Sequence, residues 1–332
     1  MRMGSFRKTT LTAALGLGLG LGLGVTAAEA GTLSIAHTTW VGYGPLYLAR
    51  DLGYFKEQGL TVDLQTIEEA SIYMAGVASG KLSGSASTVD EILKYRSSNF
   101  CFKAVVALDE SHGGDGLVVD KSITSIAALK GKTVALNEGS TSEFWFSYIL
   151  GQNGMSLKDV TVSNMTADDA AAALIAKRVP AAVSWEPNLT NVRKNGHGNL
   201  LADSSSTPGV IVDVVALSCS VIEKQPGDVK ALVDGLAKAN EFIKTNPDKA
   251  YAIMAQGVGG YLKDAKDFAE SAKGVRFYDA AQNAAYLGTA AAPGPIADLV
   301  KSADALWSTL GKTHMKVDYA VMVEPKFVHA HP

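Results

Sequence analysis

Short apolar runs rich in β-branched residues alternate along the chain with longer amphipathic runs that end near glycine. This alternation is typical of an α/β protein with a largely parallel sheet in each half and right-handed crossovers. The predicted strands are 32–36, 61–65, 84–87, 102–108, 116–119, 133–136, 160–162, 181–184 and 210–219. The predicted helices are 45–57, 71–79, 141–153, 167–177, 228–244, 247–255, 262–273 and 296–310.

The order of these elements repeats in two halves. Residues 54–62 and 150–162 share one layout of helix end, glycine and strand, and residues 81–87 are similar to 178–184. A chain of about 300 residues is also long for a single core. We therefore expect two lobes with a cleft between them, where ligands commonly bind. The expected boundaries are 31–114 for the first part of lobe 1, 115–213 for lobe 2, and 214–332 for a mostly helical return to lobe 1.

The N-terminus has the three parts of a secretory signal peptide. A basic start is followed by an apolar run over Leu11–Val25 and by the small-x-small triplet Ala28-Glu29-Ala30. A membrane anchor is the alternative, but it requires about 20 apolar residues, and alternating leucine and glycine weaken this run further. We predict that residues 1–30 are a signal peptide cleaved after Ala30 and that the mature protein is periplasmic.

Charge and composition exclude several classes of partner. The full chain has a net charge of −3, and without residues 1–30 it carries 27 basic and 32 acidic residues, a net charge of −5. Neither nucleic acid nor an acidic membrane surface is expected to bind such a chain. Cys101 and Cys219 can form one disulfide or remain two buried thiols. The histidines lack metal-ligand spacing, and no catalytic or phosphate-binding motif is present, so we expect no metal, no cofactor and no enzyme activity.

Candidate ligand-binding residues stand where the predicted strands end, because parallel α/β sheets bind ligands beyond the carboxyl ends of their strands. Polar and aromatic side chains follow most of these strands, and one aspartate lies inside the strand predicted at 210–219. The predicted ligand-binding residues are Trp40, Glu69, Ser71, Thr88, Asp109, Thr141, Ser142, Trp185, Glu186 and Asp213.

Two of these groups have a specific chemical interpretation. The segment Ser140-Thr141-Ser142-Glu143 matches a capping box, whose helix N-terminus can hold an anion or polar ligand or can simply be capped. Trp40 and Trp185 are expected to face each other across the cleft, where aromatic faces can hold an apolar stem or a cation. Ordinary aromatic packing is the alternative.

Carboxylates recur in these loops, while lysine and arginine are absent until the helices that follow. Such a wall suits a ligand with a positive group, such as an amine or a guanidinium. Some of the carboxylates are expected to cap loops and face water instead, so that fewer than half contact ligand. The carboxylates concerned are Glu69, Asp109, Asp115, Glu138, Glu186 and Asp213.

Three segments resemble a known family. They are Gly44-Pro45-Leu46-Tyr47-Leu48-Ala49 with the following Gly53–Leu60, then Leu129–Ala135, and Trp185-Glu186-Pro187. From about Leu33 to Leu310 the chain resembles the type II periplasmic solute-binding proteins of taurine, aliphatic-sulfonate and nitrate ABC importers. The resemblance implies a two-lobed, periplasmic-binding-protein-like type II α/β fold that binds without catalysis. The nitrate branch places basic residues in the cleft, and none is evident here.

Together these features predict the substrate-binding subunit of an ABC importer. Its ligand is expected to be a small nitrogen-containing organic solute, namely an amine, a guanidinium or a zwitterion such as taurine, held by closure of the lobes. The expected partners are this solute and an ABC permease at the inner membrane, with the protein itself a monomer. An aliphatic-sulfonate-binding protein is the first alternative. A thiamine-pyrimidine-synthase-like enzyme is an alternative of another class, but its lysine, histidine and cysteine-rich motif have no counterpart here.

Overall fold

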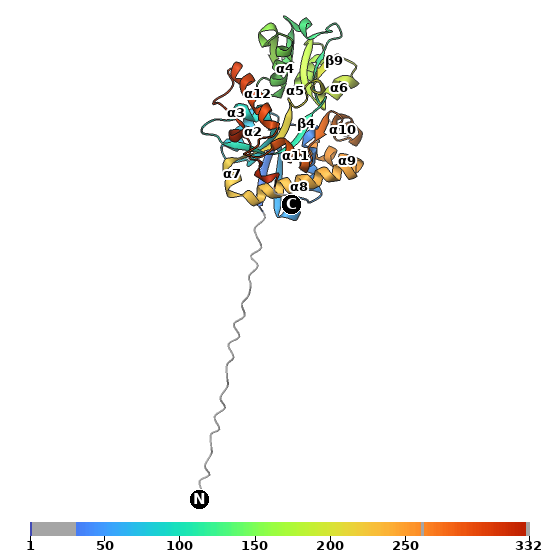
Figure 1. Cartoon of the computed structure of the whole chain (residues 1–332). Helices are drawn as coiled ribbons and strands as arrows, with labels where there is room; N and C mark the ends of the chain where they lie inside the picture. The colour runs from blue at the N-terminus through green and yellow to red at the C-terminus, as the bar shows by residue number, and fades with distance from the viewer. Residues whose placement is uncertain (2–30, 260–261, 330–332) are drawn as a thin grey trace.

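The computed structural model describes Met1 and residues 31–259 and 262–329, so the predicted signal peptide lies almost entirely outside the described residues. The described chain is a mixed α/β protein with two sheets, one in each half of the molecule (Figure 1). The first sheet has the order β11 (Val275–Phe277), β4 (Phe102–Ser111), β10 (Val212–Ser218), β3 (Gly84–Thr88), β1 (Gly31–His37) and β2 (Leu60–Thr66). The second has the order β7 (Thr161–Asn164), β6 (Thr133–Leu136), β8 (Ala181–Trp185), β5 (Asp115–Val119) and β9 (Asn199–Asp203).

Both sheets are mixed, whereas the sequence predicts largely parallel ones. Strand β1 pairs in parallel with β2 and β3, and β6 pairs in parallel with β7 and β8. The other pairs are antiparallel. Four of these five involve β5 or β10, the strands that enter their sheets directly after the chain has crossed between the two halves, and the fifth joins β11 to β4. A strand that is buried on both faces is a continuous apolar run whether it pairs in parallel or antiparallel, so the sequence pattern does not distinguish the two arrangements.

The chain crosses between the sheets twice. Strand β4 ends at Ser111 and β5 begins at Asp115 in the other sheet; β9 ends at Asp203 and β10 returns to the first sheet. We call the first sheet and the helices on it lobe 1, and β5–β9 with their helices lobe 2. Asp213, at the expected end of lobe 2, lies in β10 and therefore in a strand of lobe 1.

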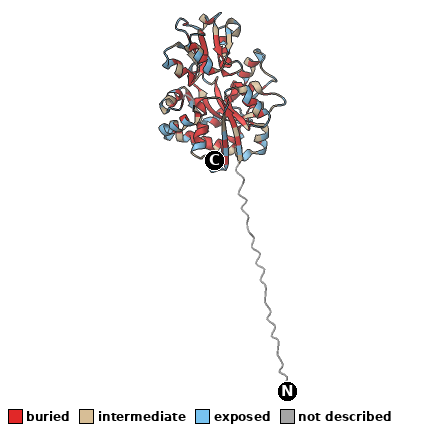
Figure 2. Cartoon of the chain, turned by 180° about the vertical axis from the view of Figure 1, so that it is seen from behind, coloured by how far each residue is buried: buried red, intermediate tan, exposed pale blue. Residues whose placement is uncertain are grey.

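Lobe 2 is a sheet covered on both faces. Leu117 and Val119 of β5 belong to the core cluster under helix α4 (Thr141–Gln152), while Val118 between them belongs to the cluster under α5 (Ala167–Ile175) and α6 (Asn188–Lys194). Successive side chains of a strand point to opposite faces, which accounts for this division. Figure 2 shows the buried residues concentrated in the two sheets.

Lobe 1 has the larger core and most of the helices. The longest helix, α8, packs along β1, β2 and β4, and α12 contacts α3 of lobe 1 and α4 of lobe 2. The predicted helix over 45–57 is α1 followed by a separate 3₁₀ turn at Lys56–Gln58, because Gly53 at φ +79° ends the first helix. The helices are α1 (Gly44–Asp51), α2 (Ala70–Ala78), α3 (Val89–Tyr95), α7 (Cys219–Lys224), α8 (Pro226–Thr245), α9 (Pro247–Val258), α10 (Ala265–Ala272), α11 (Ala280–Leu287), α12 (Ile296–Thr309) and α13 (Tyr319–Met322).

A disulfide joins Cys101 to Cys219, with 5.4 Å between the Cα atoms. Cys101 precedes β4 and Cys219 follows β10, and these neighbouring strands place Phe102 opposite Ser218. The bond spans 118 residues, including the whole of lobe 2. Closing a loop of that length removes enough unfolded-chain entropy to stabilise the fold by about 4–5 kcal/mol.

In the part of the chain described, no helix is long and apolar enough to cross a bilayer.

Candidate functional site

A small cavity lies between the lobes, beyond the carboxyl ends of β1, β3 and β8. Its volume is about 30 Å³. On the same measure one buried water needs about 10–15 Å³, so the cavity suits a compact solute. Both lobes contribute to its wall. The lining residues are Thr38, Trp40, Tyr43, Thr88, Glu91, Asp115, Thr141, Trp185, Ile211 and Asp213.

Three adjacent strands of lobe 1 align polar side chains along one wall. Asp213 of β10 lies directly opposite Thr88 of β3 and opposite Asp109 of β4, and residues opposite one another in antiparallel strands share a face. The hydroxyl of Tyr43 donates to Oδ1 of Asp213 at 2.6 Å. The indole N–H of Trp40 donates to Oδ1 of Asp109 at 3.1 Å. Oδ2 of Asp109 is buried and receives no N–H or hydroxyl donor among the described residues, and the Asp109 carboxyl also contacts that of Asp213.

Two further carboxyls reach the cavity from other elements. Glu91 of α3 accepts hydrogen bonds from the hydroxyls of Tyr73 and Ser87. Asp115 is the first residue of β5 and lies opposite Trp185, the last residue of β8. The cavity is therefore faced by carboxyls from both lobes, with Asp213 as the third.

These buried carboxyls have no basic partner. None of them is in an ion pair among the described residues, and no lysine, arginine or histidine lines the cavity. Burial raises the pKa of Asp115 to about 7 and that of Asp109 to about 8. Burial also raises the pKa of Asp213 well above its usual range, and the neighbouring Asp109 adds to this rise. A cation in the cavity would let these groups ionise.

Three aromatic side chains complete the wall: Trp40, Tyr43 and Trp185. The indole N–H of Trp185, in lobe 2, donates to the carbonyl oxygen of Thr39 in lobe 1 at 3.1 Å. Trp185 is thus held by a contact between the lobes. Aromatic faces beside carboxyls form a favourable environment for an organic cation.

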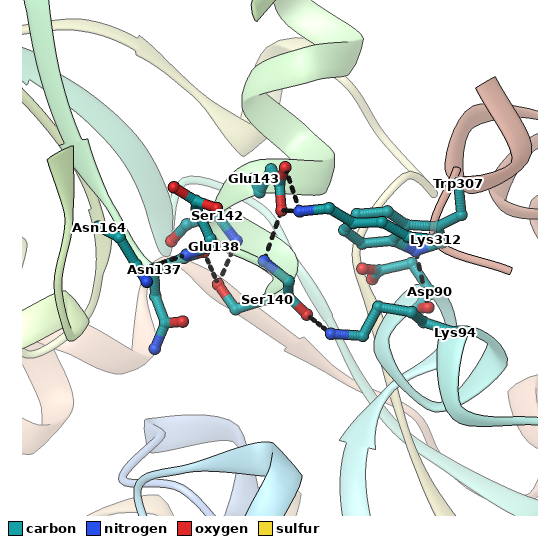
Figure 3. A network of polar contacts seen from close by, with 11 residues as sticks. Asp90, Lys94, Asn137, Glu138, Ser140, Ser142, Glu143, Asn164, Trp307 and Lys312 are labelled. Carbon is teal, nitrogen blue, oxygen red and sulfur yellow. Dashed lines mark hydrogen bonds and ion pairs between the residues drawn. The ribbon is translucent and has the colours of Figure 1, made fainter. Parts of the chain in front are cut away.

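Further polar contacts join the lobes at the rim of the cavity (Figure 3). Nζ of Lys312, just after α12, lies 2.6 Å from Oε1 of Glu143 in α4. Lys94 of α3 donates to the carbonyl oxygen of Gly139. Deeper in, the hydroxyls of Thr88 and Thr141 are 2.6 Å apart. The lobes are closed on each other through these bonds.

The N-terminus of α4 is capped differently from the predicted capping box. The hydroxyl of Ser140 accepts the N–H of Ser142 at 3.1 Å, as an N-cap does. Glu143 reaches past Ser140 and accepts the N–H of Gly139 instead. The negative charge of Glu143 therefore already sits at the positive end of this helix.

The other predicted site residues do not line this cavity. Glu69 and Ser71 line a neighbouring hollow, which shares Thr38, Glu91 and Trp185 with the cavity. Asp109 lies behind Trp40, and Ser142 is buried without lining the cavity.

Glu186 has a structural environment in lobe 2. It accepts the N–H of Thr190 at 2.9 Å in the first turn of α6 and pairs with Arg193 of the same helix. The cavity residues outside the predicted set are Thr38, Tyr43, Glu91, Asp115 and Ile211. Tyr43 follows the strand predicted at 32–36, so position alone could have included it, and Asp115, directly before the strand predicted at 116–119, was among the carboxylates expected in the wall. Glu91 lies in α3, a helix that the pattern did not predict.

Comparison with known proteins identifies the relatives of this chain. A family model described as NMT1/THI5 like matches residues 40–250. A Brucella abortus (strain 2308) protein named as a binding protein is 23% identical over 212 residues, which is 63% of this chain and 66% of that protein. A Bacillus subtilis (strain 168) protein named as an aliphatic sulfonates-binding protein is 24% identical over 212 residues, 62% of this chain and 64% of that protein. The chain thus matches just under two thirds of the length of these curated relatives.

The fold has a counterpart among solved structures. The periplasmic aliphatic sulphonate binding protein SsuA from Escherichia coli superposes with a TM-score of 0.72 at 17% identity, covering 88% of this chain and 97% of that one. The family resemblance and the two-lobed α/β fold predicted from the sequence are confirmed.

Proposed function

Because the chain belongs to the NMT1/THI5-like family, we propose that it is the periplasmic substrate-binding component of an ABC importer. In this proposal it binds a small nitrogen-containing organic solute without transforming it, and delivers it to the permease as a monomer. The observation that carries the proposal is the cavity between the lobes, with carboxyls and aromatic rings from both sides and no basic side chain in its wall.

Capture works by closing the lobes around the solute. A ligand that touches both lobes binds the closed form more tightly than the open one, so it shifts the population toward closure. Asp115, Thr141 and Trp185 would provide the contacts from lobe 2, and Tyr43 and Asp213 those from lobe 1. The two crossing segments, near residues 112–114 and 204–211, are the natural hinge, because no strand pairing continues through them.

Aliphatic-sulfonate binding is the second candidate, and the names of the relatives favour it. A sulfonate, however, is a permanent anion and would face Glu91, Asp115 and Asp213 with no cationic side chain in the cavity wall. Taking an anion out of water into such surroundings is unfavourable.

A thermal-shift and calorimetric screen of the mature protein tests the proposal. Taurine, alkanesulfonates, guanidinium, urea and small amines are compared, and a nitrogen compound is expected to raise the unfolding temperature and bind with 1:1 stoichiometry. Stabilisation by alkanesulfonates alone would favour the second candidate. Mass spectrometry after each incubation checks that the solute is recovered unchanged, and a product would contradict passive binding.

A further inference from the structure

We infer that the ligand is a compact organic cation that carries no acidic group of its own. It would lie between Trp40 and Trp185, with its N–H groups directed at Asp115, Asp213 and Glu91. This inference rests on the proposed function and narrows its ligand from amine, guanidinium or zwitterion to the first two. Four features of the cavity support it.

The first is the imbalance of charge at the cavity. Asp115, Asp213 and Glu91 line it from β5, β10 and α3, and Asp109 lies directly opposite Asp213 with one oxygen that receives no N–H or hydroxyl donor among the described residues. All four residues are buried: Asp115 is 5% exposed, Asp213 2%, Glu91 7% and Asp109 0%. Buried carboxyls without a basic partner are costly to ionise. A positive ligand would compensate several of them at once.

The second feature is that the nearby basic side chains are already engaged. Lys94 donates to the carbonyl oxygen of Gly139, Lys312 pairs with Glu143, and Arg193 pairs with Glu186. An acidic group on the ligand would have to break one of these bonds to gain a cationic partner.

The third feature concerns the helix that could otherwise hold an anion. Thr141, the first residue of α4, lines the cavity, but Glu143 of the same turn already places a carboxylate at this helix end. This helix end is therefore already occupied by the Glu143–Lys312 ion pair and offers an anion less than a free N-terminus would. A zwitterion would therefore find partners in the cavity for its positive group but none for its negative group.

The fourth feature distinguishes an organic cation from a metal ion. Among the described residues no group of His, Cys, Asp and Glu has the arrangement to hold a metal. The indoles of Trp40 and Trp185 form part of the wall, and such faces attract the diffuse charge of guanidinium or ammonium groups. The small volume restricts the solute to a few non-hydrogen atoms.

Two matched pairs of solutes test the inference by titration calorimetry on the mature protein. Guanidinium and urea have nearly the same planar shape and differ in charge, and guanidinium is used at millimolar concentrations that do not denature. Ethylammonium and taurine differ by one sulfonate group. We expect guanidinium to bind about 100-fold more tightly than urea, and ethylammonium about 30-fold more tightly than taurine.

Two variants locate the binding. Asp213→Asn is expected to weaken guanidinium binding about 100-fold. Asp120→Asn is the matched control, because Asp120 directly follows β5, the strand that begins with Asp115, and its side chain is exposed. Circular dichroism and unfolding temperature confirm that both variants fold; if Asp213→Asn does not, Asp115→Asn replaces it.

The outcomes separate this inference from the proposed function. Equal affinity for urea and guanidinium, or for taurine and ethylammonium, would overturn the inference and leave a solute-binding protein. Unchanged guanidinium affinity in Asp213→Asn would also overturn it. Failure of all four solutes, and of methanesulfonate added as a fifth, would contradict the proposed function itself.

Discussion

The carboxyls inside the cavity and those at its rim are buried to the same degree but have different partners. Glu143 and Glu186 do not line the cavity but lie within two residues of Thr141 and Trp185, which do, and we call them the rim carboxylates. They are 3% and 2% exposed, and Asp115 and Asp213 inside are 5% and 2% exposed. Each rim carboxylate forms an ion pair, with Lys312 or Arg193. Neither inner carboxyl does. Burial alone therefore does not distinguish the two sets; the lack of a cationic partner among the described residues sets apart the carboxyls of the proposed ligand site.

This contrast has a physical basis. A carboxylate removed from water needs an opposite charge or several hydrogen bonds to remain ionised at neutral pH. Lys312 and Arg193 provide that charge permanently, so Glu143 and Glu186 hold helices and lobes together whether or not solute is present. In the proposed function Asp115 and Asp213 would obtain it only from the solute, which would couple their ionisation to binding.

The largest expected effect comes from removing an inner carboxyl. Asp213→Asn keeps the shape of the side chain and a hydrogen-bond acceptor for Tyr43, but it removes the charge. We expect affinity for guanidinium to fall about 100-fold, because a charged hydrogen bond to the ligand is lost in a dry site. Glu186→Gln, at the rim, should lower the unfolding temperature while affinity changes less than about threefold. Calorimetry and thermal unfolding of both variants measure this contrast, and equal losses of affinity would remove it.

A second large effect is expected from pH. Burial is the main cause that raises the pKa of Asp115 to about 7; a hydrogen bond with Ser111 opposes this rise, and the charge of Glu186 contributes to it. Asp213, across the cavity, and Asp109 behind Trp40 also have raised pKa values because of burial. Because a cation binds the ionised form, affinity for guanidinium should rise with pH, by about tenfold per pH unit for each carboxyl that ionises on binding, and level off only above the pKa of the last of them. Calorimetry from pH 5.5 to 9 checks this, and a flat profile would mean that no inner carboxyl titrates with binding.

The same pKa shifts predict the stability of the protein without solute. Between about pH 4 and 7 these aspartates are ionised in the unfolded chain and still protonated in the folded one. The unfolded state then binds fewer protons, so the free energy of unfolding falls as pH rises. We expect the unfolding temperature to drop from pH 5 to pH 8, and saturating guanidinium to reduce that drop. A rise in stability over this range would contradict the assignment.

An intermediate effect is expected from the aromatic wall. Trp185→Ala removes an indole face from the cavity and the hydrogen bond to Thr39 across the lobes. Affinity for guanidinium should fall about tenfold, in the range of a partly desolvated cation–π contact. Trp185→Phe keeps a ring without the N–H donor and should give a smaller loss. Equal losses in the two variants would assign the whole effect to the hydrogen bond.

Much of this arrangement could be predicted from the sequence. The ends of β1, β3 and β8 are marked by short apolar runs followed by polar or aromatic residues, so Trp40, Thr88 and Trp185 were found by position. The excess of carboxylates in these loops indicated the sign of the charge.

What the sequence could not provide is the partner of each carboxylate. Glu186 is paired because α6, which the pattern did not predict, brings Arg193 back to it. Glu143 is paired with Lys312, 169 residues further along the chain. Conversely, Glu91 was missed because α3 has only seven residues, too few to show a helical period, although Thr88-Val89-Asp90-Glu91 matches a capping box in sequence. Pairing depends on tertiary packing, and local pattern contains no record of it.

The smallest expected effect comes from opening the rim. In the protein, Nζ of Lys312 lies 5.9 Å from the ring centre of Trp307 and pairs with Glu143 across the lobes. Lys312→Met keeps the apolar stem of the side chain and removes this ion pair. Lys238→Met is a close control within lobe 1: Lys238 pairs with Glu57 at 2.8 Å and also lies 5.9 Å from an aromatic ring, that of Tyr54.

Only the first pair spans the lobes, so only its loss should make closure less favourable. Partly exposed ion pairs contribute about 0.5–1 kcal/mol, which corresponds to a loss of affinity of about two- to fivefold in Lys312→Met and none in Lys238→Met. If both variants lose affinity equally, the loss comes from the change in net charge, and the ion pair between Lys312 and Glu143 takes no part in closing the lobes.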